Sequence, residues 1–494
     1  MFAACKSVGR FATALVVLSS LAGCASSPTA RMATGSVESE REVGAEQASV
    51  IERTIGLDRD PNTAAYVEQV GQRLAAQAGR KEISYRFYVA YMTVPNAFAL
   101  PGGYVYVSRG LLALLNSEDE LAGMLGHEIG HVEARHAVKR SQAALATAPV
   151  QIAAGVTGIA ASVISPDLGA GIVGAGQTLT QAVLAPYSRE QEREADRLGQ
   201  QISARAGWDP RGLRGLLDTL GREERLAGEA APAGFLATHP STPERVAATA
   251  TYAGTLAQAQ HDPIAKDRAG LLARLDGLLI GDDPMKGTFV EERFLLPNAD
   301  LRITFPHGWE MGRIAGGIGA QSPDEAAALI LQPAGIDTDP VTVARERSKS
   351  TGVDFLNGAR NTPINGLPAV RIELTVVGQK DRYWLSIAWV QLGRVVWSIV
   401  GLAPGARVRD YAPIVNDSIA SFGAMSDSDK ADITAARLRV TQALADETPE
   451  SLGQRTGSLW DANQIAVANG LAADVRFAGG ERVKVSLREV FLVP

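Results

Sequence analysis

Two histidines and a glutamate in one short stretch have the types and spacing of a metal-assisted hydrolytic site. The stretch is His127-Glu128-Ile129-Gly130-His131, an HExxH motif. Histidines four residues apart on an α-helix lie about 40° apart around its axis, so both imidazoles can reach one metal ion. Glu128 lies on the adjoining edge of the helix, beside an attacking water rather than on the metal. That position suits a general base in peptide hydrolysis.

A second acidic cluster supplies what a catalytic zinc site needs besides two histidines. Glu192, Glu194 and Asp196 lie on one predicted helix. Two histidines and one carboxylate leave the fourth tetrahedral position of zinc open, as catalysis requires. Glu192 and Asp196 share one helix face, but spacing alone does not choose between Glu192 and Glu194 as the third ligand. Asp196 suits an outer acceptor that fixes the tautomer of a zinc-bound histidine. The alternative, two surface histidines, predicts no acidic partner at all.

Helix-start signals place both groups on capped helices. Ser117 followed by Glu120 predicts a capping box, so one helix should begin there and run through the HExxH motif toward Lys139. Ser188 begins a second predicted helix, which extends to about residue 205.

The residues before the motif predict helices followed by two strands. Helical spacing over residues 38–79 is broken at Asp60-Pro61-Asn62. Alternating apolar and polar residues predict strands at Ile83–Tyr91 and Tyr104–Val107, with a sharp turn at Gly102-Gly103 between them. We expect the Tyr104–Val107 strand to pair with an extended substrate.

Composition and the first residues bound the class of protein and its compartment. A length of 494 residues predicts two or three domains, and a net charge of -6 gives no basic surface for nucleic acid. Residues 1–23 combine basic residues with an apolar stretch too short to span a bilayer, which predicts a signal peptide. Cys5 lies inside it, so the mature chain has no cysteine pair for a disulfide.

The end of this segment, Leu21-Ala22-Gly23-Cys24, resembles the lipobox of bacterial lipoproteins. The resemblance implies that Cys24 is lipidated and becomes the mature N-terminus. Ala25 at the next position implies transfer to the outer membrane, facing the periplasm. A plain secretory signal with an incidental cysteine is the alternative.

Changes of pattern divide the rest of the chain, and the fold class they predict is α+β multidomain. The predicted parts are a tether at 24–37, a metallopeptidase domain at 38–260, a linker at 261–288, an α+β accessory domain with an antiparallel sheet at 289–425, and a module at 435–494. The accessory domain resembles the PsbP-like fold. The last module resembles LysM, a β-α-α-β unit that binds glycan, and a small capping subdomain without glycan affinity is the alternative.

Residues 141–188 form a stretch with one charge, Asp167, and many small residues. Prolines and glycines interrupt it, and large aliphatic residues are sparse. We expect buried helices or a lid over the cleft, with a transmembrane hairpin as the alternative.

Residues 38–252 resemble the bacterial HExxH zinc metallopeptidase family of BepA, HtpX and the CAAX prenyl endopeptidases. Motifs on both sides of the HExxH sequence carry the resemblance. They are Asn96-Ala97-Phe98-Ala99, Gly102-Gly103, Arg135-His136, Tyr187-Ser188-Arg189, Glu192–Asp196 and Thr238-His239-Pro240 with Arg245.

The resemblance implies a mainly helical, gluzincin-type metallopeptidase domain with a small sheet and one zinc ion. It implies that Glu192, not Glu194, is the third ligand. It also implies that His239 can approach the zinc and hold the enzyme latent, and that Arg245 lies near the reacting carbonyl. The alternatives are a helix-cap neighbour for His239 and an exposed helix residue for Arg245. We expect His136 to pack near the site or support a ligand.

The prediction is therefore a membrane-anchored periplasmic zinc metalloendopeptidase that acts on unfolded or misassembled envelope proteins. Its expected partners are polypeptide substrates, the membrane through lipid on Cys24 and, through the LysM-like module, peptidoglycan. One alternative is a periplasmic chaperone or tethering protein with a latent zinc site. Another is a peptidoglycan-associated hydrolase.

Overall fold

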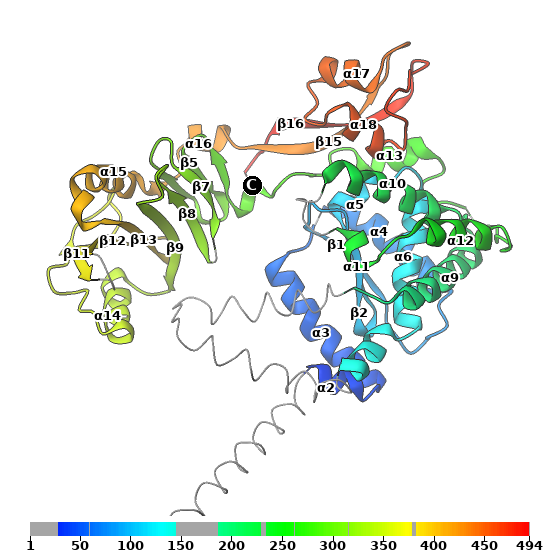
Figure 1. The fold of residues 1–494 in the computed structure, drawn as a ribbon, viewed down its shortest axis with the longest axis horizontal. Helices are drawn as coiled ribbons and strands as arrows, with labels where there is room; N and C mark the ends of the chain where they lie inside the picture. Colours follow the sequence, from blue (N-terminus) through cyan, green and yellow to red (C-terminus); the bar gives the residue numbers. More distant parts are fainter. Residues whose placement is uncertain are drawn as a thin grey trace, which may run out of the picture. The chain divides into compact units, whose positions relative to one another are not determined.

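The computed structural model describes residues 28–58, 60–144, 186–228, 234–260, 262–314, 316–377 and 382–493. These residues form two compact units, whose elements are labelled in Figure 1. Unit 1 comprises the chain up to Ile280 together with Ala436–Leu487, and unit 2 comprises Gly281–Ala435 with the residues from Arg488 onward. The domain boundaries expected from the sequence stay predictions.

Capping side chains begin most helices of unit 1. Asp60 accepts hydrogen bonds from the backbone amides of Asn62 and Thr63, and Pro61 occupies the first helical position, so the chain restarts at the predicted break. The helices before the second acidic cluster are α2 (Pro28–Ala33), α3 (Val37–Thr54), α4 (Pro61–Ala75), α5 (Arg109–Leu114) and α6 (Glu118–Glu133). Those after its start are α9 (Arg189–Ala206), α10 (Gly212–Ala227), α11 (Phe235–Thr238), α12 (Pro243–Ala253) and α13 (Arg268–Leu275).

A three-stranded sheet of unit 1 packs against α3 on one face and against α4 and α6 on the other. Its strands are β1 (Arg86–Ala90), β2 (Ala97–Leu100) and β3 (Tyr104–Ser108), in the order β1-β3-β2. Val105 and Val107 face the main core with α4 and α6, whereas Tyr106 packs against Ile51 of α3 on the opposite face. This is the alternation expected of a strand that is covered on both sides.

The strand order overturns one expectation. The Tyr104–Val107 strand, β3, pairs in parallel with β1 and antiparallel with β2, so both of its edges are already hydrogen-bonded. It therefore has no free edge for a substrate strand. Within the described residues, the edge strands of this sheet are β1 and β2.

The HExxH helix is shorter than predicted. Helix α6 ends at Glu133 instead of continuing toward Lys139, because Arg135 adopts a left-handed conformation with φ of 56°. A side chain with a Cβ reaches this region only at a cost of about 1 kcal/mol, so the surroundings must hold it. Arg135 is held by an ion pair with buried Glu40 and by a hydrogen bond to the carbonyl of Gly35. A new helical turn begins at His136.

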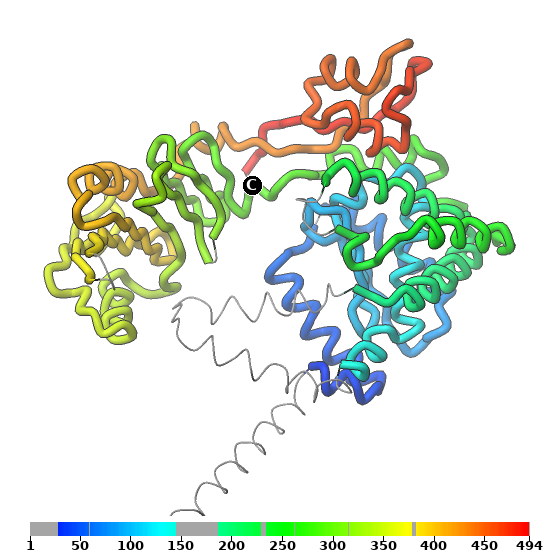
Figure 2. Tube along the Cα trace, in the orientation of Figure 1, coloured from blue at the N-terminus to red at the C-terminus, as the bar shows by residue number. Residues whose placement is uncertain are grey.

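Residues 436–487 return to unit 1 after unit 2, as the orange and red part of the tube in Figure 2 shows. The elements run in the order β15 (Thr434–Gln442), α17 (Pro449–Thr456), α18 (Ala462–Ala468) and β16 (Arg482–Val490), and the two strands pair. This is the predicted β-α-α-β order, although the order alone does not establish a LysM module. Leu438 and Ala468 belong to the same hydrophobic core as Leu121 and Leu125 of α6.

Lys484 of β16 anchors this returning segment. Its side chain is buried, and its Nζ donates to the carbonyls of Ala113, at 2.8 Å, and Leu115, at 2.6 Å, at the end of α5. Burial lowers the pKa of Lys484 well below its usual value. The Asn469 side chain holds the backbone of Lys484 through both its oxygen and its nitrogen. The segment thus satisfies carbonyls that helix α5 leaves free at its end.

Unit 2 has antiparallel sheets, as the sequence predicts. A seven-stranded sheet has the order β10-β11-β12-β13-β9-β8-β7, and a four-stranded sheet has the order β14-β6-β5-β4. Their strands are β4 (Thr288–Val290), β5 (Arg293–Leu296), β6 (Leu301–Thr304), β7 (Glu310–Ile314), β8 (Gly317–Gln321), β9 (Ala328–Ile336), β10 (Arg360–Asn361), β11 (Ala369–Val377), β12 (Arg382–Leu392), β13 (Val395–Pro404) and β14 (Gly423–Ala424).

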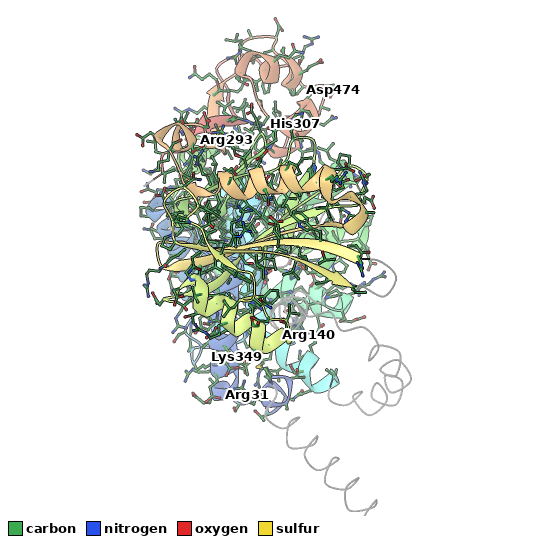
Figure 3. All side chains as sticks on the ribbon, turned by 90° about the vertical axis from the view of Figure 1, so that its left-hand side faces the viewer. Arg31, Arg140, Arg293, His307, Lys349 and Asp474 are labelled. Atoms are coloured by element: carbon green, nitrogen blue, oxygen red, sulfur yellow. The ribbon has the colours of Figure 1, made fainter. Side chains whose placement is uncertain are left out.

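Helices cover both faces of the larger sheet of unit 2. Figure 3 shows α14 (Pro340–Thr351) and α15 (Val408–Ser421) on opposite sides of it. Neighbouring residues of β12 alternate between the two cores, because Ala388 packs with Val415 of α15 whereas Trp389 packs with Val343 of α14. A short helix, α16 (Asp427–Ala431), follows.

Candidate metal centre

Two capped helices carry the predicted metal ligands. Ser117 accepts the amide of Glu120 at the start of α6, but the reciprocal half of the predicted capping box is absent, because the Glu120 carboxylate accepts the Asn116 amide instead. At α9, Ser188 and Gln191 make both hydrogen bonds of a capping box. Helix α9 ends at Gly207, whose φ of 99° suits glycine.

Glycines let α6 and α9 approach closely. A Cβ added to Gly199 of α9 would lie 2.6 Å from the backbone nitrogen of His127, and one added to Gly130 of α6 would lie 2.7 Å from the Ala195 carbonyl oxygen. A Cβ added to Gly126 would lie 2.9 Å from the Gly199 carbonyl oxygen. Contacts this short leave no space for any side chain, so the helices meet backbone to backbone. This brings the ligands of one helix within reach of those of the other.

Four buried side chains gather between these helices and the loop after α11. His127, His131, Glu192 and His239 each offer one ligand atom, and these atoms all lie within 4.8 Å of one another. The two Nε2 atoms of His127 and His131 are 3.0 Å apart, and they lie 3.7 Å and 3.4 Å from the Glu192 carboxylate. Tetrahedral zinc with bonds of about 2.0–2.1 Å holds its ligand atoms about 3.4 Å apart. The two histidines and Glu192 therefore fit zinc.

Glu128 lies beside this cluster, and no side chain of the described residues donates a hydrogen bond to its carboxylate. The side chain is fully buried, and its Oε1 is 3.6 Å from Nε2 of His239. Burial raises the pKa of Glu128 to about 7, with opposing effects of His127 and Glu192. Burying a carboxylate without a side-chain partner costs free energy, so its presence here indicates a function. Its raised proton affinity suits a general base near neutral pH.

Asp196 and Arg245 support the cluster from behind. The Asp196 Oδ1 atom lies 2.9 Å from Nδ1 of His127. Arg245 binds both oxygens of Asp196 and also contacts Oε2 of Glu192 at 2.6 Å. Burial raises the pKa of Glu192 to about 8 against the opposing charge of Arg245, and a bound cation would favour the ionised carboxylate. The structure thus brings Asp196 and Arg245 together at the predicted site.

Two aromatic residues frame the cluster. Tyr187 stacks on His131 with ring centroids 4.0 Å apart, and Phe235 stacks on His239 at 4.2 Å with an interplanar angle of 7°. The sequence analysis gave Phe235 no role. In the sequence, Phe235 is marked only by its position one helical turn before His239. An ordinary core aromatic residue could occupy the same position.

Other predicted residues lie away from the centre or outside the described residues. Glu194 points away from the cluster toward His136, at 3.2 Å. Cys24, the signal peptide and most of the apolar stretch at 141–188 lie outside the described residues. Among the described residues, no helix combines the length and apolar character needed to cross a bilayer.

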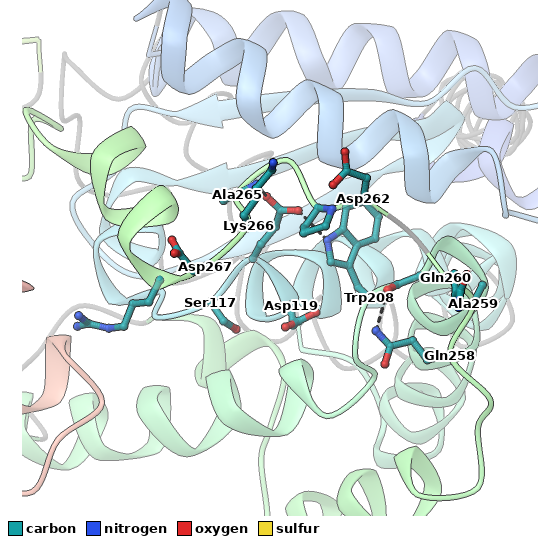
Figure 4. A pocket seen from close by; sticks show the side chains of 14 residues that line it. Ser117, Asp119, Trp208, Gln258, Ala259, Gln260, Asp262, Ala265, Lys266 and Asp267 are labelled. Carbon is teal, nitrogen blue, oxygen red and sulfur yellow. Dashed lines mark hydrogen bonds between the residues drawn. The ribbon is translucent and has the colours of Figure 1, made fainter.

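A cavity of about 980 Å³ lies at the start of α6, away from the metal cluster (Figure 4). Ser117, Trp208 and Lys266 are among the residues that line it, and none of the four cluster residues does. Glu118, at its edge, accepts hydrogen bonds from the Trp208 indole and the Ile264 amide. We therefore interpret this cavity as structural. The residues around it hold the first turn of α6 in place.

An HExxH helix, a glutamate from a second helix and an unpaired general base define a zinc metallopeptidase, and comparison with known proteins gives the same class. Residues 61–253 match the model of Peptidase family M48. This region is similar to that family of zinc metallopeptidases, and the cluster of His127, His131, Glu192 and His239 could hold a zinc ion.

Three curated relatives illustrate the similarity. The beta-barrel assembly-enhancing protease of Yersinia pestis is 29% identical over 50% of this chain and 50% of its own length. Mitochondrial metalloendopeptidase OMA1 of Schizosaccharomyces pombe is 33% identical over 37% of this chain and 51% of its own. Metalloprotease YcaL of Escherichia coli strain K12 is 34% identical over 33% of this chain and 64% of its own. The chain thus spans about half the length of the first two relatives.

One solved structure shows only a slight likeness to this chain. The solution structure of cyanobacterial PsbP (CyanoP) from Synechocystis sp. PCC 6803 aligns with 28% of this chain and 95% of its own, at 12% identity and a TM-score of 0.22. Similarity at that level supports no conclusion, so the PsbP-like fold stays a prediction.

Proposed function

We propose that the protein is a membrane-anchored periplasmic zinc metalloendopeptidase that cleaves unfolded or misassembled envelope proteins. The observation that carries the enzymatic part is the unpaired Glu128 carboxylate beside the cluster of His127, His131 and Glu192. The name of the Yersinia pestis relative, a beta-barrel assembly-enhancing protease, supports the envelope role.

His127, His131 and Glu192 hold the zinc, with His127 oriented by Asp196. Bound zinc supplies a Lewis acid that polarises a carbonyl and makes water more acidic. Glu128 takes the proton of the attacking water and then delivers it to the amine that leaves when the peptide bond breaks. Burial raises the pKa of Glu128, which favours a carboxyl that can both accept and return a proton.

We assign Arg245 to positioning, in place of the role at the reacting carbonyl that the family resemblance implied. Its Nε and Nη2 bind Asp196, and its Nη1 faces Glu192 and the carbonyls of His239 and Pro240. These contacts use the donors of the guanidinium within the protein, so they do not face a substrate carbonyl. His239 remains our candidate for a group that would approach the zinc and hold the enzyme latent, since its Nε2 makes no hydrogen bond among the described residues.

An extended substrate would pair with β2, one of the two edge strands of the described sheet, instead of β3. Main-chain pairing tolerates many side chains, which suits an enzyme that acts on unfolded polypeptides. Peptidoglycan binding has less support, because Lys484 and Asn469 of the LysM-like segment are buried in contacts within unit 1.

The decisive experiment compares the purified protein with its Glu128→Gln variant. Both should bind one zinc ion by metal analysis, and the variant should degrade an unfolded polypeptide at least about 100-fold more slowly. Equal degradation by the variant would overturn the catalytic assignment and leave the chaperone or tethering alternative. Absence of zinc from the wild type would overturn the metal site.

A second variant tests the anchor. Cys24→Ser should lose metabolic labelling by fatty acid and move from the membrane fraction to the periplasmic fraction. If Cys24→Ser is labelled and sediments with membranes as the wild type does, the lipoprotein proposal is wrong.

A further inference from the structure

The break after α6 turns a third histidine toward the metal cluster. On a continuous helix, residues five apart lie about 140° apart around the axis and do not face each other. The left-handed Arg135 interrupts the helix, and Nδ1 of His136 lies 2.9 Å from Nδ1 of His131. A costly backbone conformation therefore coincides with a specific contact to a predicted zinc ligand.

The contact continues through His136 to the surface. His136 is fully buried, and its Nε2 lies 3.2 Å from Oε2 of Glu194, whose side chain is 44% exposed. Lys139 contacts the same carboxylate oxygen at 3.3 Å. A hydrogen-bonded path thus leads from His131 to solvent in two steps.

Metal binding determines where the protons lie along this path. Nε2 of His131 faces His127 and Glu192, so it is the atom that must be unprotonated to bind zinc. The proton of neutral His131 then lies on Nδ1 and is donated to Nδ1 of His136. Because that nitrogen accepts, neutral His136 carries its own proton on Nε2 and donates it to Glu194. Every donor in this path has an acceptor.

We propose that His136 and Glu194 are positioning residues that fix the tautomer and orientation of His131 and strengthen its bond to zinc. The inference rests on the proposed ligand set. It gives the two glutamates of α9 separate tasks, since Glu192 joins the cluster and Glu194 supports it through His136. The two zinc histidines then differ, because a buried carboxylate lies directly behind His127, whereas a neutral imidazole connects His131 to an exposed one.

The test measures the zinc dissociation constant of the full chain by competition with a chelator. His136→Leu, which keeps bulk but has no acceptor, should weaken zinc binding about 10–100-fold. His136→Asn, whose Oδ1 can accept at the place of Nδ1, should recover part of that loss. The visible spectrum of the cobalt(II)-substituted protein should shift in His136→Leu and return toward wild type in His136→Asn.

Glu194→Gln provides a variant that is safe for folding, because this side chain is partly exposed. It should weaken zinc binding about 10-fold, at the lower end of the range of about 10–100-fold for supporting residues. Glu190→Gln, a matched loss of charge on an exposed residue of the same helix, should bind zinc as the wild type does.

Unchanged affinity and cobalt spectra in both Glu194→Gln and His136→Leu would overturn the inference while leaving the proposed ligand set intact. Lower thermal stability of the zinc-free variants with unchanged zinc affinity would also overturn it, because His136 would then only pack. Failure of the ligand set has a different signature, namely full zinc binding by His131→Ala.

Discussion

Arg245 binds Asp196 through two parallel hydrogen bonds, from Nε to Oδ2 and from Nη2 to Oδ1, each 2.7 Å long. Both side chains are buried, and Arg245 also contacts Glu192. The planar guanidinium thus joins the carboxylate behind His127 to the third predicted zinc ligand, a geometry that lysine cannot reproduce.

Replacing Arg245 with Met should destabilise unit 1 strongly. Removing one partner of a buried ion pair leaves an uncompensated charge and costs about 3–5 kcal/mol. Urea denaturation of the zinc-free protein measures the loss. Arg193→Met is the matched control, because Arg193 pairs with Glu244 in an exposed contact and should change stability by less than about 1 kcal/mol. Similar losses in both variants would contradict the importance of the buried pair.

The same pair predicts a pH dependence. Burial alone raises the pKa of Asp196, but hydrogen bonds from Arg245 and His127 outweigh burial and hold the pKa at about 2. Because this value is below that of an unfolded aspartate, the carboxylate stabilises the fold above about pH 4 and loses that contribution as the pH falls toward 2. The difference in free energy of unfolding between wild type and Arg245→Met should therefore shrink on acidification. Denaturation series at several pH values would show it, and a constant difference would contradict the assignment.

Gly199→Ala should disturb the metal centre through packing alone. Its Cβ would lie 2.6 Å from the backbone nitrogen of His127, so α6 and α9 must separate. We expect a loss of about 1–3 kcal/mol in stability together with weaker zinc binding. Gly221→Ala in α10 is the control, because the nearest atom to its Cβ is a flexible arginine terminus at 3.5 Å. That variant should be as stable as the wild type or slightly more stable. Full zinc affinity in Gly199→Ala would show that the helices can move apart without cost to the site.

Lys484→Met should loosen the returning segment of unit 1. The carbonyls of Ala113 and Leu115 would lose their buried donor, which costs about 2–4 kcal/mol in total. Hydrogen exchange should increase in residues 462–490 and at the α5 to α6 junction. Lys266→Met, at an exposed position of unit 1, is the control and should leave exchange unchanged. If exchange rises in neither region, the segment is held by its apolar contacts alone.

Local chemistry was predictable from the sequence, whereas features that depend on distant contacts were not. The start of α6 at Ser117 and of α9 at Ser188 follows from side chains that cap their own helices. The break at Arg135 does not, because Glu40, about a hundred residues away in sequence, helps to hold it. The HExxH histidines and the acidic cluster on the second helix signalled a zinc site. Only the resemblance to a family chose Glu192 over Glu194, since both lie on one helix within two residues of each other.

The order of strands in the sheet was likewise not predictable from the sequence. The alternation of apolar and polar residues located β1 and β3. Strand pairing leaves no local signature in the sequence, so substrate pairing was expected at β3, although both edges of β3 are already paired. The packing of residues 436–487 within unit 1 depends on buried Lys484. Lysine is rarely buried, so the sequence gives no sign of this role.

The return of residues 436–487 to unit 1 has a consequence for the order in which the molecule can be built. Ribosomes make proteins from the N-terminus, so the HExxH helix is synthesised long before Lys484, and the whole of residues 281–435 emerges between them. Contacts so distant in sequence form late and slowly. The core that contains the HExxH helix therefore lacks a part until residues 436–487 have been synthesised, which delays completion of this fold during biosynthesis.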